Sequence, residues 1–184
     1  MNVGEELVAA YLQHIKGCDF IQQNLYPPGV QGEIDVVGIN LSKPSVYICE
    51  VAIHLVTGLQ YVKNNQPNNV GKLVDKFSKD IEYGRQYFQH HEQHYMLWSP
   101  VVRRSKSEAA YSQERDLEEL QAEIQRRYGV EIECVVNEDF QRRIEELREY
   151  ARKRTEELKN PVLRLLQIEE ALKKHLDKRA KGSL

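Results

Sequence analysis

Two carboxylates in the sequence have the type and spacing that suit work on a metal ion. Asp35 lies in a short apolar stretch, and Glu50 lies inside a nearly continuous apolar run from Ser45 to Leu55. An ionised carboxylate in an apolar strand is costly to bury without a partner, which favours a functional role for Glu50. The two residues are fifteen positions apart, which fits neighbouring strands joined by a turn. Side by side, they could share Mg²⁺, which prefers oxygen ligands and keeps waters that a substrate phosphate can replace.

The elements that must position these carboxylates alternate between strand and helix patterns. Apolar residues recur at helical spacing over residues 3–16, 70–89 and 114–128, and strands are expected over 19–25, 33–39, 45–55, 95–102 and 130–136. The order αβββαβαβ predicts an α/β protein. Asn137 is then expected to cap a long helix that runs to about Leu158, and Asn160-Pro161 separates it from a last helix.

Composition limits the classes of protein and partner. The chain has 184 residues, of which 41% are hydrophobic and 29% charged, as expected for one globular domain with a helical appendage. A formal charge of -2 excludes a strongly basic chain, so any binding of nucleic acid must use a local patch. No apolar stretch is long enough to span a membrane. The three cysteines are far apart in the sequence, so they imply neither disulfides nor a zinc site. We expect a cytoplasmic protein with no membrane partner.

Three short motifs resemble those of a known superfamily. They are Gly4-Glu5-Glu6-Leu7-Val8-Ala9-Ala10-Tyr11-Leu12, Gly32-Glu33-Ile34-Asp35 and Val46-Tyr47-Ile48-Cys49-Glu50-Val51. In this order they resemble the restriction-endonuclease-like PD-(D/E)xK nucleases, nearest to small Holliday-junction-resolvase-like and uncharacterised bacterial nuclease-like proteins. The resemblance implies an αβββαβ nuclease-like core over 1–136, with a central mixed sheet flanked by helices. It also implies that this core cleaves DNA as an endonuclease with Mg²⁺, or with Mn²⁺ as a substitute. It leaves RNA open as a substrate. Residues 137–184 match nothing in this family and form a helical extension.

The resemblance also assigns roles to particular residues. It makes Asp35 and Glu50 metal ligands, gives the backbone carbonyl of Val51 a metal contact, and makes Glu5 a supporting carboxylate with Glu6 as the fallback. The family has a catalytic lysine two positions after the second acid, where this chain has Ala52.

Three explanations for Ala52 are open. The residue is an engineered substitution that disables cleavage, or the lysine's function has moved, or the chain is a natural pseudo-nuclease that binds without hydrolysis. For the second explanation, His54 on the same strand or Lys72 or Lys76 on the following helix could reach the site.

Basic residues and the tail supply the candidate contacts to partners. Lys72 and Lys76 lie in one stripe of their helix, and Arg103 and Arg104 follow a strand, so all four are candidates for phosphate contacts. The two C-terminal helices are amphipathic, which predicts a homodimer or another partner-binding role. The alternative to a nuclease is therefore a non-catalytic nucleic-acid-binding module, or an oligomeric adaptor, on the same fold.

Overall fold

The computed structural model describes residues 2–28, 32–106 and 111–181, and it confirms an α/β architecture. The last residues of the predicted extension, 182–184, lie outside this part. The central strands are β1 (Phe20–Leu25), β2 (Ile34–Asn40), β3 (Ser45–Val51), β6 (Glu92–Ser99) and β7 (Ile132–Val136). The helices are α1 (Val3–His14), α2 (Asn69–Tyr87), α3 (Gln113–Tyr128), α4 (Asn137–Arg152) and α5 (Pro161–Lys181). The predicted order of elements is confirmed.

The five strands form one mixed sheet in the order β1-β2-β3-β6-β7. The first three are antiparallel neighbours, whereas β3, β6 and β7 run parallel. Parallel neighbours need crossover connections, and α2 and α3 supply them. β3 is buried on both faces because it lies at the centre of the sheet, which explains its continuous apolar run.

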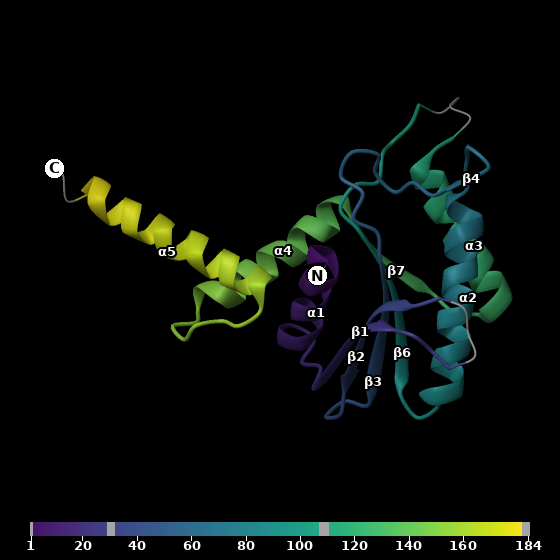
Figure 1. The fold of residues 1–184 in the computed structure, drawn as a ribbon, viewed down its shortest axis with the longest axis horizontal. Helices are drawn as coiled ribbons and strands as arrows, with labels where there is room; N and C mark the ends of the chain where they lie inside the picture. Colours follow the sequence, from purple (N-terminus) through teal and green to yellow (C-terminus); the bar gives the residue numbers. More distant parts are fainter. Residues whose placement is uncertain (1, 29–31, 107–110, 182–184) are drawn as a thin grey trace.

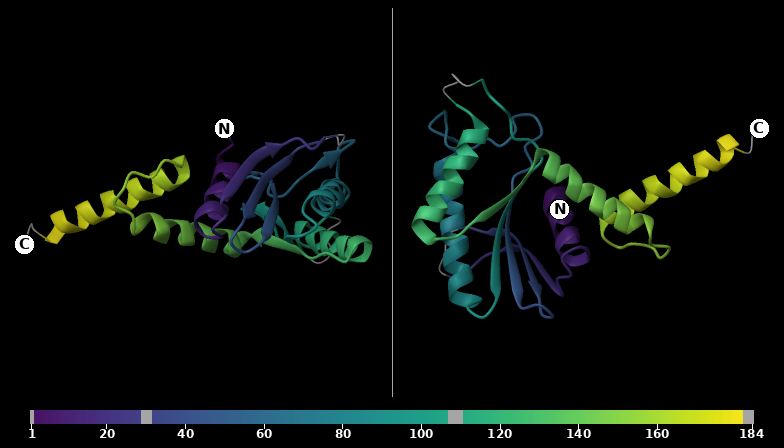
Figure 2. Two further views of the ribbon diagram at one scale, coloured as in Figure 1. Left: turned by 90° about the horizontal axis from the view of Figure 1, so that it is seen from below. Right: turned by 180° about the vertical axis from the view of Figure 1, so that it is seen from behind.

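Helices cover both faces of the sheet (Figures 1 and 2). One core cluster joins α1 and α4 to the first face, and a second joins α2 and α3 to the other. Gly4 allows α1 to sit close to the sheet, since a Cβ there would lie 2.2 Å from Ile53 Cγ1. The same glycine opens the first of the three motifs, so the start of α1 lies against the chain that leaves β3.

Several expected boundaries are wrong. β3 ends at Val51 rather than near Leu55, β6 covers Glu92–Ser99 rather than 95–102, and α4 ends at Arg152 rather than near Leu158. The polar loop before α2 also contains a small pair of strands, β4 (Val62–Lys63) and β5 (Gln66–Pro67). Asn137 does not cap α4 with its side chain. Its side-chain amide instead forms two hydrogen bonds with the backbone of Val102. These bonds hold the first residue of α4 against the segment that follows β6.

The C-terminal helices leave the body of the protein in sequence. α4 packs against β7 and α1, and the first turns of α5 pack beside it, with Leu163 and Leu166 buried. The rest of α5 projects away from the sheet (Figure 1). Its exposed apolar residues are Leu165, Ile168, Leu172 and Leu176. Such a row is typical of a helix that meets a partner, and the homodimer stays a prediction. Among the described residues, no helix is long and apolar enough to cross a membrane.

Candidate functional site

Asp35 and Glu50 meet at one end of the β2–β3 ladder. Val36 pairs with Cys49, so the next residues along each strand, Asp35 and Glu50, stand opposite one another. Both side chains are buried, with Asp35 6% and Glu50 1% exposed. Asp35 Oδ2 accepts a hydrogen bond of 2.7 Å from the backbone N–H of Val51, which fixes the first carboxylate beside the second strand. The predicted juxtaposition of the two acids is thus present.

Lys76 from α2 reaches both carboxylates. Its ammonium donates a hydrogen bond to Glu50 Oε2 and lies 3.6 Å from Asp35 Oδ2. Burial alone would lower the pKa of Lys76, but the two carboxylates outweigh that effect and raise it above its ordinary value. Lys76 is therefore fully charged at neutral pH. The ammonium of Lys76 thus contacts both acids from the helix that faces them.

A cleft of about 230 Å³ opens over this group of charges. Glu50 of β3 lines it together with charged side chains from α2 and with one from the segment before β2. Those from α2 are Lys72, Lys76, Lys79 and Asp80, and the one before β2 is Glu33. Lys72 and Lys79 are exposed, whereas Glu50 and Asp80 are buried. The cleft thus has lysines within reach of solvent and carboxylates below them, a distribution that suits an anionic ligand together with a cation.

Asp80 is a third carboxylate that the sequence analysis did not identify. It is 2% exposed and lies one helical turn after Lys76, beside Glu50. Burial raises the pKa of Asp80 to about 7, against the lowering effects of a hydrogen bond with Glu50 and of the Lys76 charge. Burial likewise raises the pKa of Glu50 well above its usual range, with Asp80 and Asp35 adding to the effect. The two carboxyl groups therefore share a proton in acid.

The raised pKa of Asp80 predicts a fall in stability with rising pH. In metal-free protein, folded Asp80 keeps a proton that the unfolded chain, with a pKa near 3.8, releases, so unfolding becomes easier between that pH and about 7. An Asp80→Asn variant should lose part of this fall, on the order of a few kcal/mol, and match or exceed the wild type at pH 8. Urea denaturation at several pH values measures both slopes. Identical slopes would show that Asp80 is ionised throughout.

Glu5 does not contact the two strand carboxylates. Its side chain accepts hydrogen bonds from the amides of Asn2 and Asn24, the latter at 2.9 Å. Asn24 has a left-handed φ of 49° and lies in β1 between residues that pair with Val36 and Ile34, so it stands opposite Asp35. Glu5 therefore contacts Asn24, the residue opposite Asp35 on the neighbouring strand. Its proposed support of a metal or water stays a prediction. Glu6 contacts the side chain of Asn160 instead.

Ala52 and Lys76 belong to the same side of the sheet. Ala52 is 2% exposed and packs, like Ile48, in the core cluster that α2 covers. A lysine at position 52 would consequently extend on the side from which Lys76 now approaches. His54 lies beyond the end of β3 and is exposed, so its predicted place on the strand is wrong.

Tyr61 is a further site residue that sequence reasoning missed. Burial raises the pKa of its hydroxyl, and the charges of Lys76, Glu50 and Asp35 also affect this pKa. Its N–H donates to Asn69 Oδ1 at 2.6 Å, and this bond holds the loop against the start of α2. The ring of His54 lies edge-on to that of Tyr61, with centroids 5.8 Å apart. His54 therefore lies against Tyr61.

The two arginines predicted to contact phosphate interact with a different part of the protein. Arg103 donates to the backbone carbonyl of Val56, and its own N–H donates to Gln113 Oε1 at 2.8 Å. Arg104 lies 3.9 Å from Glu114. Neither is among the described residues that line the Glu50 cleft. The structure thus brings Lys72 and Lys76 to the carboxylates and leaves Arg103 and Arg104 aside, and phosphate contacts by the arginines stay a prediction.

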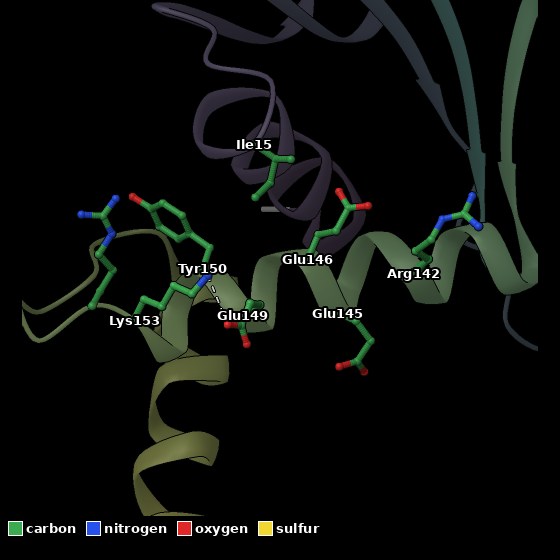
Figure 3. A pocket seen from close by; sticks show the side chains of 8 residues that line it. Ile15, Arg142, Glu145, Glu146, Glu149, Tyr150 and Lys153 are labelled. Atoms are coloured by element: carbon green, nitrogen blue, oxygen red, sulfur yellow. Dashed lines mark ion pairs between the residues drawn. The ribbon is translucent and has the colours of Figure 1, made fainter.

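A larger hollow of about 690 Å³ lies along α4 and the end of α1 (Figure 3). Its charged side chains are paired: Glu149 lies 3.2 Å from Lys153, Glu146 lies 2.9 Å from Arg143, and Glu145 lies 3.3 Å from Arg148. These ion pairs leave no strong unmet charge, so we assign the site to the smaller cleft.

The carboxylates fit a metal ion only in part. Within the described ranges, no three His, Cys, Asp or Glu side chains converge as a metal-ligand group. The Lys76 ammonium also contacts both Asp35 and Glu50, which leaves them already paired with a positive charge. However, Glu50 Oε1 and Asp80 Oδ2 are buried, and no described group other than the two carboxyl groups themselves supplies them with a hydrogen bond. Such oxygens suit Mg²⁺, which needs few protein ligands because water and substrate phosphate complete its coordination.

Comparison of the chain with known proteins adds no relative. No family model matches the sequence, and searches of curated proteins and of solved structures return no significant match. The fold and the site therefore define the protein at a coarse level, as an α/β protein with a charged cleft at one end of its sheet. The resemblance to the nuclease superfamily stays a prediction from three short motifs.

Proposed function

We propose that the protein hydrolyses phosphodiester bonds of DNA as a Mg²⁺-dependent endonuclease of the restriction-endonuclease-like fold. The observation that carries this proposal is the contact of Lys76 with both Glu50 and Asp35. It supports the second explanation for Ala52, in which the lysine has moved from the strand to the facing helix. The mixed sheet order, with Asp35 and Glu50 on neighbouring strands, also supports the proposal.

Each charged group of the cleft has a different role toward a phosphodiester. Lys72 and Lys79 are placed to hold the phosphate backbone at the cleft. Lys76 is protonated at neutral pH, so it suits stabilisation of negative charge on the phosphate better than deprotonation of water. Glu50 accepts the hydrogen bond from the Lys76 ammonium and so orients it. Bound Mg²⁺ would supply a polarised phosphate and a water of lowered pKa.

Cleavage by the wild-type chain is the direct test. With Mg²⁺ or Mn²⁺, we expect cleavage of at least one substrate among junction, duplex and single-stranded DNA, and loss of that cleavage by at least about a hundredfold in Glu50→Gln, as for removal of a key charged group. An RNA substrate in the same panel shows whether the activity extends beyond DNA. The matched control is Glu119→Gln, which changes an exposed carboxylate on α3. Absence of cleavage on every substrate would contradict the proposal.

A second candidate is a module that binds nucleic acid without cleaving it. Lys76 favours it as well, because an ammonium that neutralises Asp35 and Glu50 replaces the cation that they would otherwise bind.

Salt dependence tests the binding surface for both candidates. Binding to duplex DNA should weaken steeply with salt, and the double variant Lys72→Ala and Lys79→Ala should lower the slope of log K against log salt by about 0.9 per lost phosphate contact. Arg103→Ala with Arg104→Ala is the matched double variant, and we expect a smaller change for it. An equal or larger change for the arginines would place the nucleic acid on the other surface.

A further inference from the structure

The space between Asp35 and Glu50 is a poor place for a cation in this protein. The Lys76 ammonium already lies there, and the backbone N–H of Val51 donates to the Asp35 oxygen that faces Lys76. A divalent cation placed beside a fixed ammonium is repelled at a few ångströms, most strongly in a buried setting. A cation must therefore approach Glu50 from another direction.

Two carboxyl oxygens, one from Glu50 and one from Asp80, have only each other's groups as partners. Glu50 Oε1, the oxygen that does not contact Lys76, and Asp80 Oδ2 are both buried, and no other described group donates a hydrogen bond to them. The two carboxyl groups hydrogen-bond to one another when one of them is protonated. Their residues line the same cleft and are 1% and 2% exposed. Once both carboxyl groups have lost their protons, two buried anionic oxygens face one cleft without a donor, and this arrangement calls for a cation that is not part of the chain.

We propose that a divalent cation of the Mg²⁺ class binds between Glu50 Oε1 and Asp80 Oδ2. Mg²⁺ commonly uses only one or two protein carboxylates and keeps waters for the remaining positions. The cleft of about 230 Å³ has room for those waters or for a phosphate oxygen, and Lys72 and Lys79 line it to hold the phosphate's remaining charge. Lys76 then stays between Glu50 and Asp35 while the cation occupies the other side of Glu50. In relation to the proposed nuclease, Asp80 becomes a metal ligand and Asp35 a residue that positions Lys76.

Calorimetric titration of the full chain with Mn²⁺ alone, without nucleic acid, tests the site. At pH 8 we expect one Mn²⁺ per chain, displaced by excess Mg²⁺. Asp80→Asn and Glu50→Gln should each weaken binding more than tenfold, whereas Asp35→Asn should change it less than threefold. Asp75→Asn is the matched control, since it makes the same change at an exposed position of the same helix. Urea denaturation of each variant shows whether it is folded at the temperature of the titration.

The outcomes separate this site from the site that the sequence implies. Weak binding in Asp35→Asn together with unchanged binding in Asp80→Asn would overturn the proposal in favour of the gap between the two strands. Absence of Mn²⁺ binding by the wild type would also overturn it, and would mean that Glu50 and Asp80 simply share a proton. The function rests on a different readout: Mn²⁺ binding that needs Asp80, without cleavage of any nucleic acid, would keep the cation site and reject the nuclease.

Discussion

Replacing Lys76 by methionine is expected to lower cleavage at least a hundredfold and to leave substrate binding within about fivefold, in line with the loss of one charge-stabilising group. Methionine keeps most of the apolar stem and removes only the ammonium that contacts Glu50 and lies near Asp35. The effect should fall mainly on kcat, because the ammonium stabilises charge that develops in the transition state. Single-turnover cleavage at saturating enzyme measures this step separately from binding.

A structural cost must be separated from that chemical one. Removing one partner of a buried ion pair costs about 3–5 kcal/mol when the other charge stays uncompensated, although Glu50 can take up a proton. Urea denaturation in the assay buffer therefore accompanies the rate measurement. Lys159→Met, which changes an exposed lysine before α5, is the control. A folded Lys76→Met variant that cleaves at the wild-type rate would remove Lys76 from the mechanism and leave it as a structural ion pair.

The sequence predicts the strand carboxylates well because their signals are local. Asp35 and Glu50 stand in apolar strands of a recognisable period, and the turn between the strands leaves only one simple pairing. The helices follow equally from their apolar stripes. Asn137 shows the limit of such local reasoning, since its place before a helix predicts a cap while its side chain bonds to Val102, distant in sequence.

Asp80 and Tyr61 could not be assigned in the same way. Asp80 does carry a signal, because it falls with Leu73 and Phe77 on the buried side of α2, where a carboxylate is unusual. Its meaning depends on the contact with Glu50, and no periodicity predicts that contact. Tyr61 lies in an irregular segment, and only the packing of this segment against α2 brings its hydroxyl near Lys76. Long-range packing thus completes a site of which two carboxylates and two lysines are predicted from the sequence.

Moving the lysine back to the strand is the most demanding test of this site. In the double variant Ala52→Lys with Lys76→Ala, we expect cleavage at least tenfold faster than in Lys76→Ala alone. Ala52 belongs to the core cluster covered by α2, so a lysine there extends toward the space that Lys76 vacates. Ala52→Lys in the presence of Lys76 should instead be slow and less stable by about 1–3 kcal/mol, since it overpacks a filled position and adds a second ammonium. Initial rates with saturating Mg²⁺ compare the three variants.

The control for this exchange adds bulk without charge. Ala52→Met with Lys76→Ala fills the same space, so any rate that the lysine version has above it is due to the ammonium alone. A clear excess would mean that the two carboxylates accept a catalytic lysine from either position 52 or the helix. It would also mean that Lys76 makes a lysine at position 52 unnecessary. Equal rates would mean that the ammonium on α2 neutralises Asp35 and Glu50 without helping hydrolysis. The cleft would then be that of a protein that holds nucleic acid and does not cut it.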